Sequence, residues 1–386
     1  MRNRNIHTKR TLQTIQYVCS VLFALFSIVY LYCFQSNLLA QEQFYFSHGQ
    51  TTYNALLGAL LLTFGLLLLG LLFQRVLRLS SSFQAVAWMP SCYILGVLTM
   101  MTFSNIPTDT QQIPYFMLVA IPILFILLLS LSKILLDVRK GVTLRNTLPS
   151  NLFLMFLMFL SVGMMGNSSV LFHYEMNASQ LAKEGRYSDA LKVAEKSTET
   201  TPLLSASRAF SLSKLQKLGD NLFHYPMPST SRFLLPEPAD TLRVANISSE
   251  VYSHLGVYPL VRNSFSPKHF LNHAFSNDTL RSAAIIEYLL CAHLLDADLN
   301  SFAEICVAYK DTSAQSTIEM HYKEALLLYE NQTEISDSFP CINDSIRKAF
   351  EDFLFTKDTL RNNLSIKENC KRKYGDTYWF HYYFSH

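Results

Sequence analysis

The stretch Ala55–Phe73, ALLGALLLTFGLLLLGLLF, decides the fold class of this chain. A bilayer hydrocarbon core about 30 Å thick needs about 20 apolar residues of helix, and this stretch meets that length. Only a helix satisfies its own backbone amides in lipid, where an unpaired N–H or C=O costs several kcal/mol. The stretch therefore predicts a membrane-spanning helix.

Four further apolar runs share this character. None of them contains Asp, Glu, Lys, Arg or His; they are Thr14–Phe34, Phe83–Phe103, Pro114–Leu131 and Leu152–Phe172. Pro90 interrupts the run from Phe83, and Pro122 predicts a kink in the run from Pro114, because proline removes a helical hydrogen bond. The prediction is an all-α chain whose residues 1–172 form a membrane domain with five transmembrane helices.

Basic residues set the predicted orientation. Lys and Arg are absent from residues 35–54 and 104–113, whose only formal charges are Glu42 and Asp109. They occur instead on the alternate sides of the runs, at Arg2, Arg4, Lys9, Arg10, Arg75, Arg78, Lys133, Arg139, Lys140 and Arg145. Cytoplasmic loops carry such an excess, so the N-terminus is predicted in the cytoplasm. The first run is longer than a usual signal-peptide apolar region, so we expect it to remain as a helix. Five crossings then place everything after residue 172 on the other side.

Residues 173–386 form the second predicted domain. They carry 22 of the 32 Lys and Arg and 26 of the 29 Asp and Glu, a net charge of −4. The overall charge of +3 therefore reflects membrane topology. No basic stripe interleaved with aromatic residues occurs, so we do not expect nucleic-acid binding.

The segment Tyr174–Pro202, YEMNASQLAKEGRYSDALKVAEKSTETTP, resembles a tetratricopeptide repeat, which has a period of about 34 residues. In that comparison one helix packs through its apolar positions, Gly185 makes the turn, a second helix packs back on the first, and Pro202 ends it. The predicted repeat-packing residues are Tyr174, Ala178, Leu181, Gly185, Tyr187, Ala190, Leu191, Ala194 and Pro202.

Further helices are predicted along the rest of this domain. Helical spacing of apolar residues marks Ser248–Gly256, Leu280–Leu295, Asn300–Tyr309, Ile318–Tyr329 and Ile346–Phe355. Strand-like alternation is scarce. We therefore expect a tetratricopeptide-like α-α superhelix, in which each helix pair buries a face of its neighbour.

Four cysteines of this domain leave two possibilities open. Cys291, Cys306, Cys341 and Cys370 are either two disulfides in an oxidising compartment or four buried thiols. Proximity in sequence favours the pairs Cys291–Cys306 and Cys341–Cys370. No pair has CxxC spacing, so no zinc or thioredoxin-type site is indicated.

Candidate chemistry is weak. His269 and His273 would share a helix face, as metal ligands can, but neither an HExxH pattern nor a third ligand accompanies them. A polar surface pair is the simpler interpretation. Ser211–Lys214 and Ser130–Lys133 fit the SxxK spacing of a serine activated by lysine, without the partner motifs. We therefore assign no catalytic residue, metal ligand or cofactor.

The C-terminus concentrates aromatic residues at Tyr378, Trp379, Phe380, Tyr382, Tyr383 and Phe384. The simplest expectation is a last helix that closes the domain with aromatic bulk. Docking at the membrane surface and a partner-binding patch are the alternatives.

The chain as a whole resembles an uncharacterised family of Bacteroidetes membrane proteins with several N-terminal spans and a tetratricopeptide-like exported region. The residues that carry this resemblance are Leu212–Pro226, Ile286–Phe302 and Tyr374–Phe384. The resemblance implies a Gram-negative inner membrane and a periplasmic domain, and it supplies no catalytic residues.

Three functions are considered, and a transporter or channel is the least favoured because the five runs contain no Asp, Glu, Lys, Arg or His. The first is a membrane-anchored helical-repeat scaffold at the cell envelope, with the lipid bilayer and another envelope protein or peptide as partners. The alternative is a polytopic membrane enzyme, or an accessory subunit, in lipid or envelope-glycan metabolism. Its acid–base groups would come from Glu42, His48 and Asp109 in the two outer loops.

Overall fold

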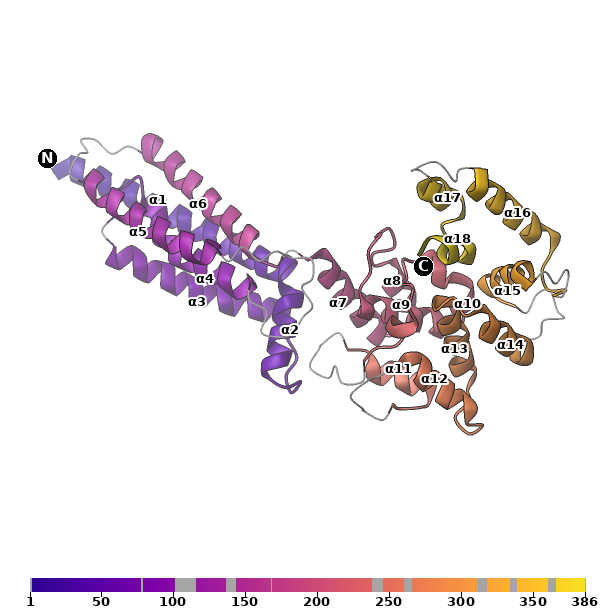
Figure 1. Cartoon of the computed structure of the whole chain (residues 1–386). Coiled ribbons are helices and arrows are strands. Elements are labelled where there is room, and N and C mark those ends of the chain that lie inside the picture. Colours follow the sequence, from indigo (N-terminus) through magenta and orange to yellow (C-terminus); the bar gives the residue numbers. More distant parts are fainter. Residues whose placement is uncertain are drawn as a thin grey trace. The chain divides into compact units, whose positions relative to one another are not determined.

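The computed structural model describes residues 2–77, 79–100, 116–136, 144–167, 169–237, 246–259, 266–310, 318–333, 339–359 and 366–385 (Figure 1). Every regular element in these ranges is a helix. The described residues up to Val170 form one compact unit, and those from Leu171 onward form a second. The predicted loop residues Arg78, Asp109, Arg139 and Lys140 lie outside the described residues.

The first unit is a bundle of apolar helices (Figure 1). Four helical segments are long and apolar enough to cross a membrane: Arg10–Phe34, Ala55–Val76, Phe116–Ile134 and Leu144–Met165. A shorter apolar helix, Gln84–Met100, corresponds to the run predicted from Phe83 to Phe103, whose last residues are outside the described part of the chain. The elements of this unit are α1 (Arg2–Val29), η1 (Tyr30–Phe34, a π-helix), α2 (Ser36–Phe46), α3 (Ala55–Val76), η2 (Gln84–Trp88), α4 (Met89–Met100), α5 (Phe116–Leu136) and α6 (Leu144–Met165).

The third and the last apolar runs differ in detail from their predicted form. The third run changes from the 3₁₀ helix η2 to the α-helix α4 just before Pro90. Pro90 then lies in the first turn of α4, where a missing N–H is tolerated. The last run begins earlier than Leu152, at Leu144, and its helix ends at Met165. Residues 170–172 belong to the next helix, α7.

Buried polar contacts show the direction of each helix. At one end of the bundle, Gln16 Nε2 donates to Gln84 Oε1 at 3.0 Å, and Asn151 Oδ1 accepts from the Ala85 N–H at 2.8 Å. At the other end, the hydroxyls of Tyr30 and Thr99 are 3.0 Å apart, and the Asn167 N–H donates to the Thr99 carbonyl at 2.8 Å. Helices α1, α4 and α6 therefore run in the same direction.

Helices α3 and α5 run the opposite way. The Ser91 hydroxyl donates to Leu66 O at 2.9 Å, and Gly70, one turn further along α3, lies against Trp88. Similarly, the Tyr93 hydroxyl donates to Leu118 O at 3.0 Å, whereas Ser132, near the end of α5, accepts from the Ser80 N–H. The five helices thus alternate in direction along the chain.

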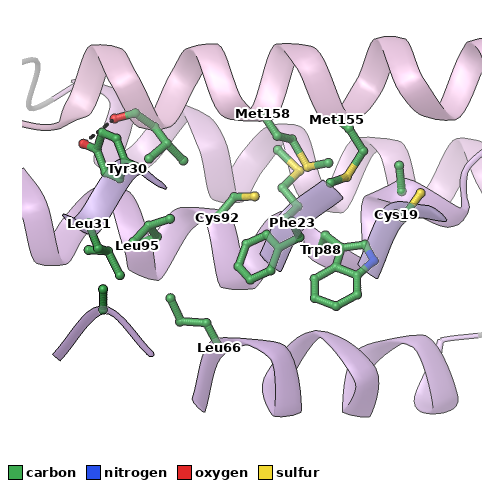
Figure 2. Packing of buried hydrophobic residues seen from close by; sticks show 14 of the residues in the cluster. Cys19, Phe23, Tyr30, Leu31, Leu66, Trp88, Cys92, Leu95, Met155 and Met158 are labelled. Atoms are coloured by element: carbon green, nitrogen blue, oxygen red, sulfur yellow. Dashed lines mark hydrogen bonds between the residues drawn. The ribbon is translucent and has the colours of Figure 1, made fainter. Parts of the chain in front are cut away.

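The hydrogen bonds at the two ends of the bundle form two polar layers, one around Gln84 and one around Thr99. An apolar core fills the space between these layers (Figure 2). The rings of Phe23 and Trp88 stack with centroids 4.8 Å apart, and Met155 and Met158 of α6 lie against them. A Cβ added to Gly70 would come within 2.3 Å of the Trp88 ring, so only glycine lets α3 approach this closely. The outward side chains are also apolar, as Leu61, Phe64 and Ile126 illustrate at 60–68% exposure. Such a surface suits lipid contact.

The second unit contains α7 (Val170–Lys183), α8 (Tyr187–Lys192), α9 (Pro202–Lys214), α10 (Leu218–Asn221), α11 (Ser248–Leu255), α12 (Pro267–Ser276), α13 (Ala283–Leu295), α14 (Leu299–Tyr309), α15 (Met320–Thr333), α16 (Asp344–Thr359), α17 (Ile366–Tyr374) and α18 (Tyr378–Ser385), with short 3₁₀ turns η3 (Leu222–His224) and η4 (Ser231–Phe233). The predicted helices at Ser248–Gly256 and Leu280–Leu295 are confirmed. Gly256 ends α11 with φ +78°, a left-handed C-cap that favours glycine.

Sequential helices of this unit pack on one another along α12, α13, α14 and α15. Other contacts join elements that are distant in sequence: α10 packs against α13 and α15, and α18 returns to α15. A quasi-linear stack has contacts only between neighbouring repeats, so these returns give the unit a more closed arrangement.

Candidate functional site

The predicted repeat-packing residues lie on α7, α8 and the segments that flank α8. Ala178 and Ala190 are buried at 0% and 2% exposure, and Leu191 is buried beside Ala190. Tyr174, Leu181, Tyr187 and Ala194 are half-buried, and Gly185 is exposed. Gly185 occupies the turn between α7 and α8 with φ +76°, the left-handed region that favours glycine.

Two of these predictions are wrong. The second helix of the pair ends at Lys192, so Ala194 lies in the following turn with φ +57°. Pro202 does not end a helix but occupies the first turn of α9, where Thr201 caps the Leu204 N–H. Proline suits either place by sequence, because it is excluded only from the helix interior.

The weak catalytic and metal candidates stay separate from one another. His269 and His273 are both exposed on α12, and the described residues contain no group of three or more His, Cys, Asp or Glu that could hold a metal ion. Ser211 and Ser130 each donate their hydroxyl to the backbone carbonyl four residues earlier. Neither hydroxyl is therefore directed at its SxxK lysine.

The outer-loop candidates are only partly described. Glu42 is buried on α2, and His48 is exposed in the turn that follows, with φ +49°. Asp109, the third member of that group, lies outside the described residues. The four cysteines of the second unit, Cys291, Cys306, Cys341 and Cys370, are buried thiols without disulfides.

A buried histidine–carboxylate pair holds the C-terminal helix. His321 and Glu324, one turn apart on α15, are 1% and 2% exposed, and Nδ1 of His321 is 3.0 Å from Glu324 Oε2. The same carboxylate oxygen accepts the N–H of Tyr378, the first residue of α18, at 2.8 Å. The Trp379 indole N–H donates to the Glu324 carbonyl at 2.9 Å. A carboxylate at a helix N-terminus also complements the helix dipole.

Three histidines gather around Phe223. Its ring centroid is 5.1 Å from that of His321 and 4.7 Å from that of His381, and the rings of His224 and His321 are 5.5 Å apart. Burial, followed by the neighbouring His321, lowers the pKa of His224, while surrounding carboxylates oppose the shift. A histidine oriented by a carboxylate can act as a general base. Here α18 covers the pair, so a substrate would reach it only after that helix moved.

A buried arginine is the second polar feature. Arg208 lies in the middle of α9 and is 1% exposed, and burial lowers its pKa to about 10. Its Nη2 donates to the Ala194 carbonyl at 2.9 Å, and its Cζ lies 5.1 Å from the centroid of the Tyr225 ring. The described part of the chain places no carboxylate within ion-pair distance of it.

The family comparison covers nearly the whole chain. The model of a family of unknown function (DUF6057) matches residues 16–264 and 260–385. The chain belongs to this family. The family carries no assigned activity, which agrees with the resemblance to an uncharacterised group. No curated protein and no solved structure matches the chain.

Sequence reasoning missed both buried polar groups for identifiable reasons. Arg208 stands inside LLSASRAFSLS, a run of small and apolar residues that could have marked it as a buried charge. The His321–Glu324 spacing of one helical turn is common, and only the return of α18 gives it a role. The expected inward packing of the aromatic C-terminus holds for Tyr378, Trp379 and Phe380, which are buried. Tyr382, Tyr383 and Phe384 are half-buried.

Proposed function

We propose that this protein is an integral membrane protein that carries a helical binding module on the outer face of a bacterial inner membrane. The observation that carries the proposal is the alternating direction of the five apolar helices, together with the four segments long enough to span a bilayer. The two polar layers lie 14 to 16 residues apart along α1, α4 and α6, about 21–24 Å at 1.5 Å per residue. Gln84–Met100 is shorter than the four other segments, but it runs parallel to α1 and α6 and contributes to both polar layers, which supports a fifth crossing.

The charge distribution supports the orientation. The sides on which Lys and Arg are concentrated would face the cytoplasm, and the acidic second unit would face the periplasm, as in the bacterial group that the chain resembles. An odd number of crossings would place the N-terminus and the second unit on opposite sides of the membrane.

A binding role suits the second unit. Its first helices resemble a tetratricopeptide-like pair, and its later helices pack sequentially, so it would be an irregular helical-repeat module that closes on itself through α18. Such modules provide a rigid surface without needing a reactive group. We therefore favour an envelope scaffold that recognises another envelope protein or peptide.

Cysteine labelling in intact cells tests the topology. In a Cys33→Ser background, His48→Cys should react with a membrane-impermeant maleimide, and Arg145→Cys should react only after permeabilisation. Alkaline phosphatase fused after residue 386 should be active and a matching GFP fusion dark. Labelling of Arg145→Cys from outside, or a fluorescent C-terminal fusion, would overturn the orientation.

Site-specific crosslinking tests the binding role. Photoreactive residues at the exposed positions Tyr258, Tyr309, Met320 and Phe355 sample different parts of the second unit. If the unit is a scaffold, the positions that line its binding surface should crosslink to the same envelope protein, and the remaining positions should give no crosslink. The same weak pattern at all four positions would argue against it.

A further inference from the structure

Helix α9 contains the most deeply buried charge of the second unit's described residues. Every residue from Leu203 to Ser213 is buried, and Arg208 is the only charged side chain among them, at 1% exposure. Side chains on a helix lean toward its N-terminus. Arg208 accordingly reaches back to Thr200, eight residues earlier and just outside the helix.

The partners of the guanidinium group are all neutral. Nη2 donates to the Ala194 carbonyl at 2.9 Å, Nη1 makes a long contact of 3.4 Å with the Thr200 hydroxyl, and the Tyr225 ring lies alongside. Nε is buried and has no hydrogen-bond partner among the described residues. An arginine has five N–H groups, so most of its donor capacity is unused here.

An uncompensated buried charge is unusual, because desolvation is offset only by an ion pair or by complete hydrogen bonding. Burial lowers the pKa of Arg208 to about 10, so the group is still cationic at neutral pH. Replacement by an apolar residue would avoid this cost. An anion bound beside the guanidinium would offset the same cost.

Two acidic residues that act on neighbours of Arg208 do not provide that anion. Glu175 is directed elsewhere, since it accepts from the Thr201 hydroxyl at 2.6 Å. Glu195 is exposed, and its charge acts on Tyr225, whose pKa burial and Glu195 both raise. Neither carboxylate is within 4 Å of the guanidinium.

The surroundings of Arg208 add further groups that favour an anion. The positive end of α9 begins at Pro202, close to Thr200, and its dipole has the same sign as the guanidinium. The hydroxyls of Thr200 and Ser205, 3.0 Å apart, can both reorient to donate. The covering turn, Val193–Lys196, includes Ala194 in a left-handed conformation that costs a non-glycine residue free energy.

We propose that Arg208 is the anchor of a carboxylate-binding site beneath the Val193–Lys196 turn. One guanidinium carries one positive charge, so a monoanionic carboxylate balances it, whereas a phosphate dianion would leave excess charge buried. The planar fork of the guanidinium binds a carboxylate through two parallel N–H bonds, and the unpartnered Nε supplies one of them. The turn would move outward to admit the ligand, and Ala194 would give up its bond to Nη2.

Hydrogen exchange with mass spectrometry tests the site on the full-length chain in detergent. The probes are sodium acetate, sodium phosphate and sodium chloride at equal ionic strength. Acetate should slow amide exchange in peptides covering residues 193–205 at least threefold relative to chloride. The same protection should appear in Arg186→Gln, a matched control that removes an exposed arginine nearby.

Two variants examine the role of the guanidinium itself. Arg208→Met should abolish the acetate effect, and Arg208→Lys, which keeps the charge but lacks the fork, should weaken it. Equal exchange of the wild-type chain in all three salts would overturn the proposal, and this measurement needs no variant to fold. Protection by phosphate alone would refute the carboxylate assignment. If the Arg208→Met variant keeps its helical fold and acetate still protects it fully, the role of Arg208 is refuted.

This inference does not depend on the proposed membrane orientation or partner. The exchange experiment is done in detergent, where topology has no influence. The labelling experiment can therefore fail while the carboxylate site stands, and the reverse also holds.

Discussion

Among the described side chains of α1, α3, α4, α5 and α6, the buried polar ones are neutral. The core of the second unit also contains Arg208, His321, Glu324 and Glu330. Both units are helical, so secondary structure does not explain the difference. Helices in lipid gain little from the hydrophobic effect and associate through close packing and neutral hydrogen bonds. A helical unit can bury a charge when a second element supplies its partner. Arg347, for example, pairs with Glu330 at 2.7 Å.

The largest expected effect is slow alkylation of two thiols buried in the core of the second unit. Burial raises the pKa of Cys291 and of Cys306 to about 12 each. The thiolate is the reactive form, so alkylation by a water-soluble maleimide at pH 8 should be about a thousandfold slower than in the unfolded chain. Peptide mass spectrometry before and after urea unfolding measures this ratio. Rapid labelling of the folded chain would show that these thiols are accessible, or that the unit opens readily.

Removal of the aromatic anchor of α18 should produce the next largest effect. Trp379 is 1% exposed, its ring lies 5.0 Å from that of Phe350, and its N–H is bonded to Glu324. Trp379→Ala should cost about 3–5 kcal/mol of the second unit's stability. Pulse proteolysis in urea measures that loss. The matched control Phe355→Ala, at a residue 71% exposed, should change stability by about 0.5 kcal/mol or less. Equal losses in the two variants would mean that α18 is not packed as described.

A steric change breaks the corresponding contact in the first unit. Gly70→Leu places atoms where the Trp88 ring lies, so we expect a loss of about 1–3 kcal/mol from overpacking. Helical circular dichroism during titration of mixed micelles with SDS measures it. Gly65→Leu is the control, because an added Cβ there meets nothing within 4 Å. A tolerated Gly70→Leu would show that α3 and Trp88 do not pack closely.

The smallest expected effect concerns a half-buried charge and its pH dependence. Partial burial acts to raise the pKa of Asp298, but hydrogen bonds from Ser301, Lys268 and His293 outweigh it and lower the pKa to about 2. A lowered folded-state pKa stabilises the protein above the unfolded-state value, and this stabilisation is lost as pH falls toward 2. Asp298→Asn should therefore cost about 1–2 kcal/mol at pH 6.

Urea unfolding of both chains at several pH values measures this difference. The gap between wild type and Asp298→Asn should narrow from about pH 4 downward and close near pH 2. A gap that does not change with pH would mean that Asp298 acts through its shape or its N-cap bond to Ser301 and not through its charge.

The fold was predictable wherever one local signal was sufficient. The run Ala55–Phe73 is a helix, as its length and apolar composition predict, and Gly256 ends α11 because a left-handed C-cap favours glycine. The role of Pro202 was not predictable, since proline is compatible with the end of one helix and with the start of the next. The candidate site was even harder to predict from the sequence. Glu324 acquires its role only when Tyr378, 54 residues later, donates to it.

The sequence by itself determined the helical class, the apolar segments suited to a bilayer and the inward packing of the aromatic C-terminus. These properties depend on composition and on spacing within a single segment, where the local physics is the same in any context. Tertiary structure alone decided the closure of α18 onto α15 and the isolation of the Arg208 charge. Each of these depends on contacts between segments far apart in the chain, and no local pattern encodes which partner will be near.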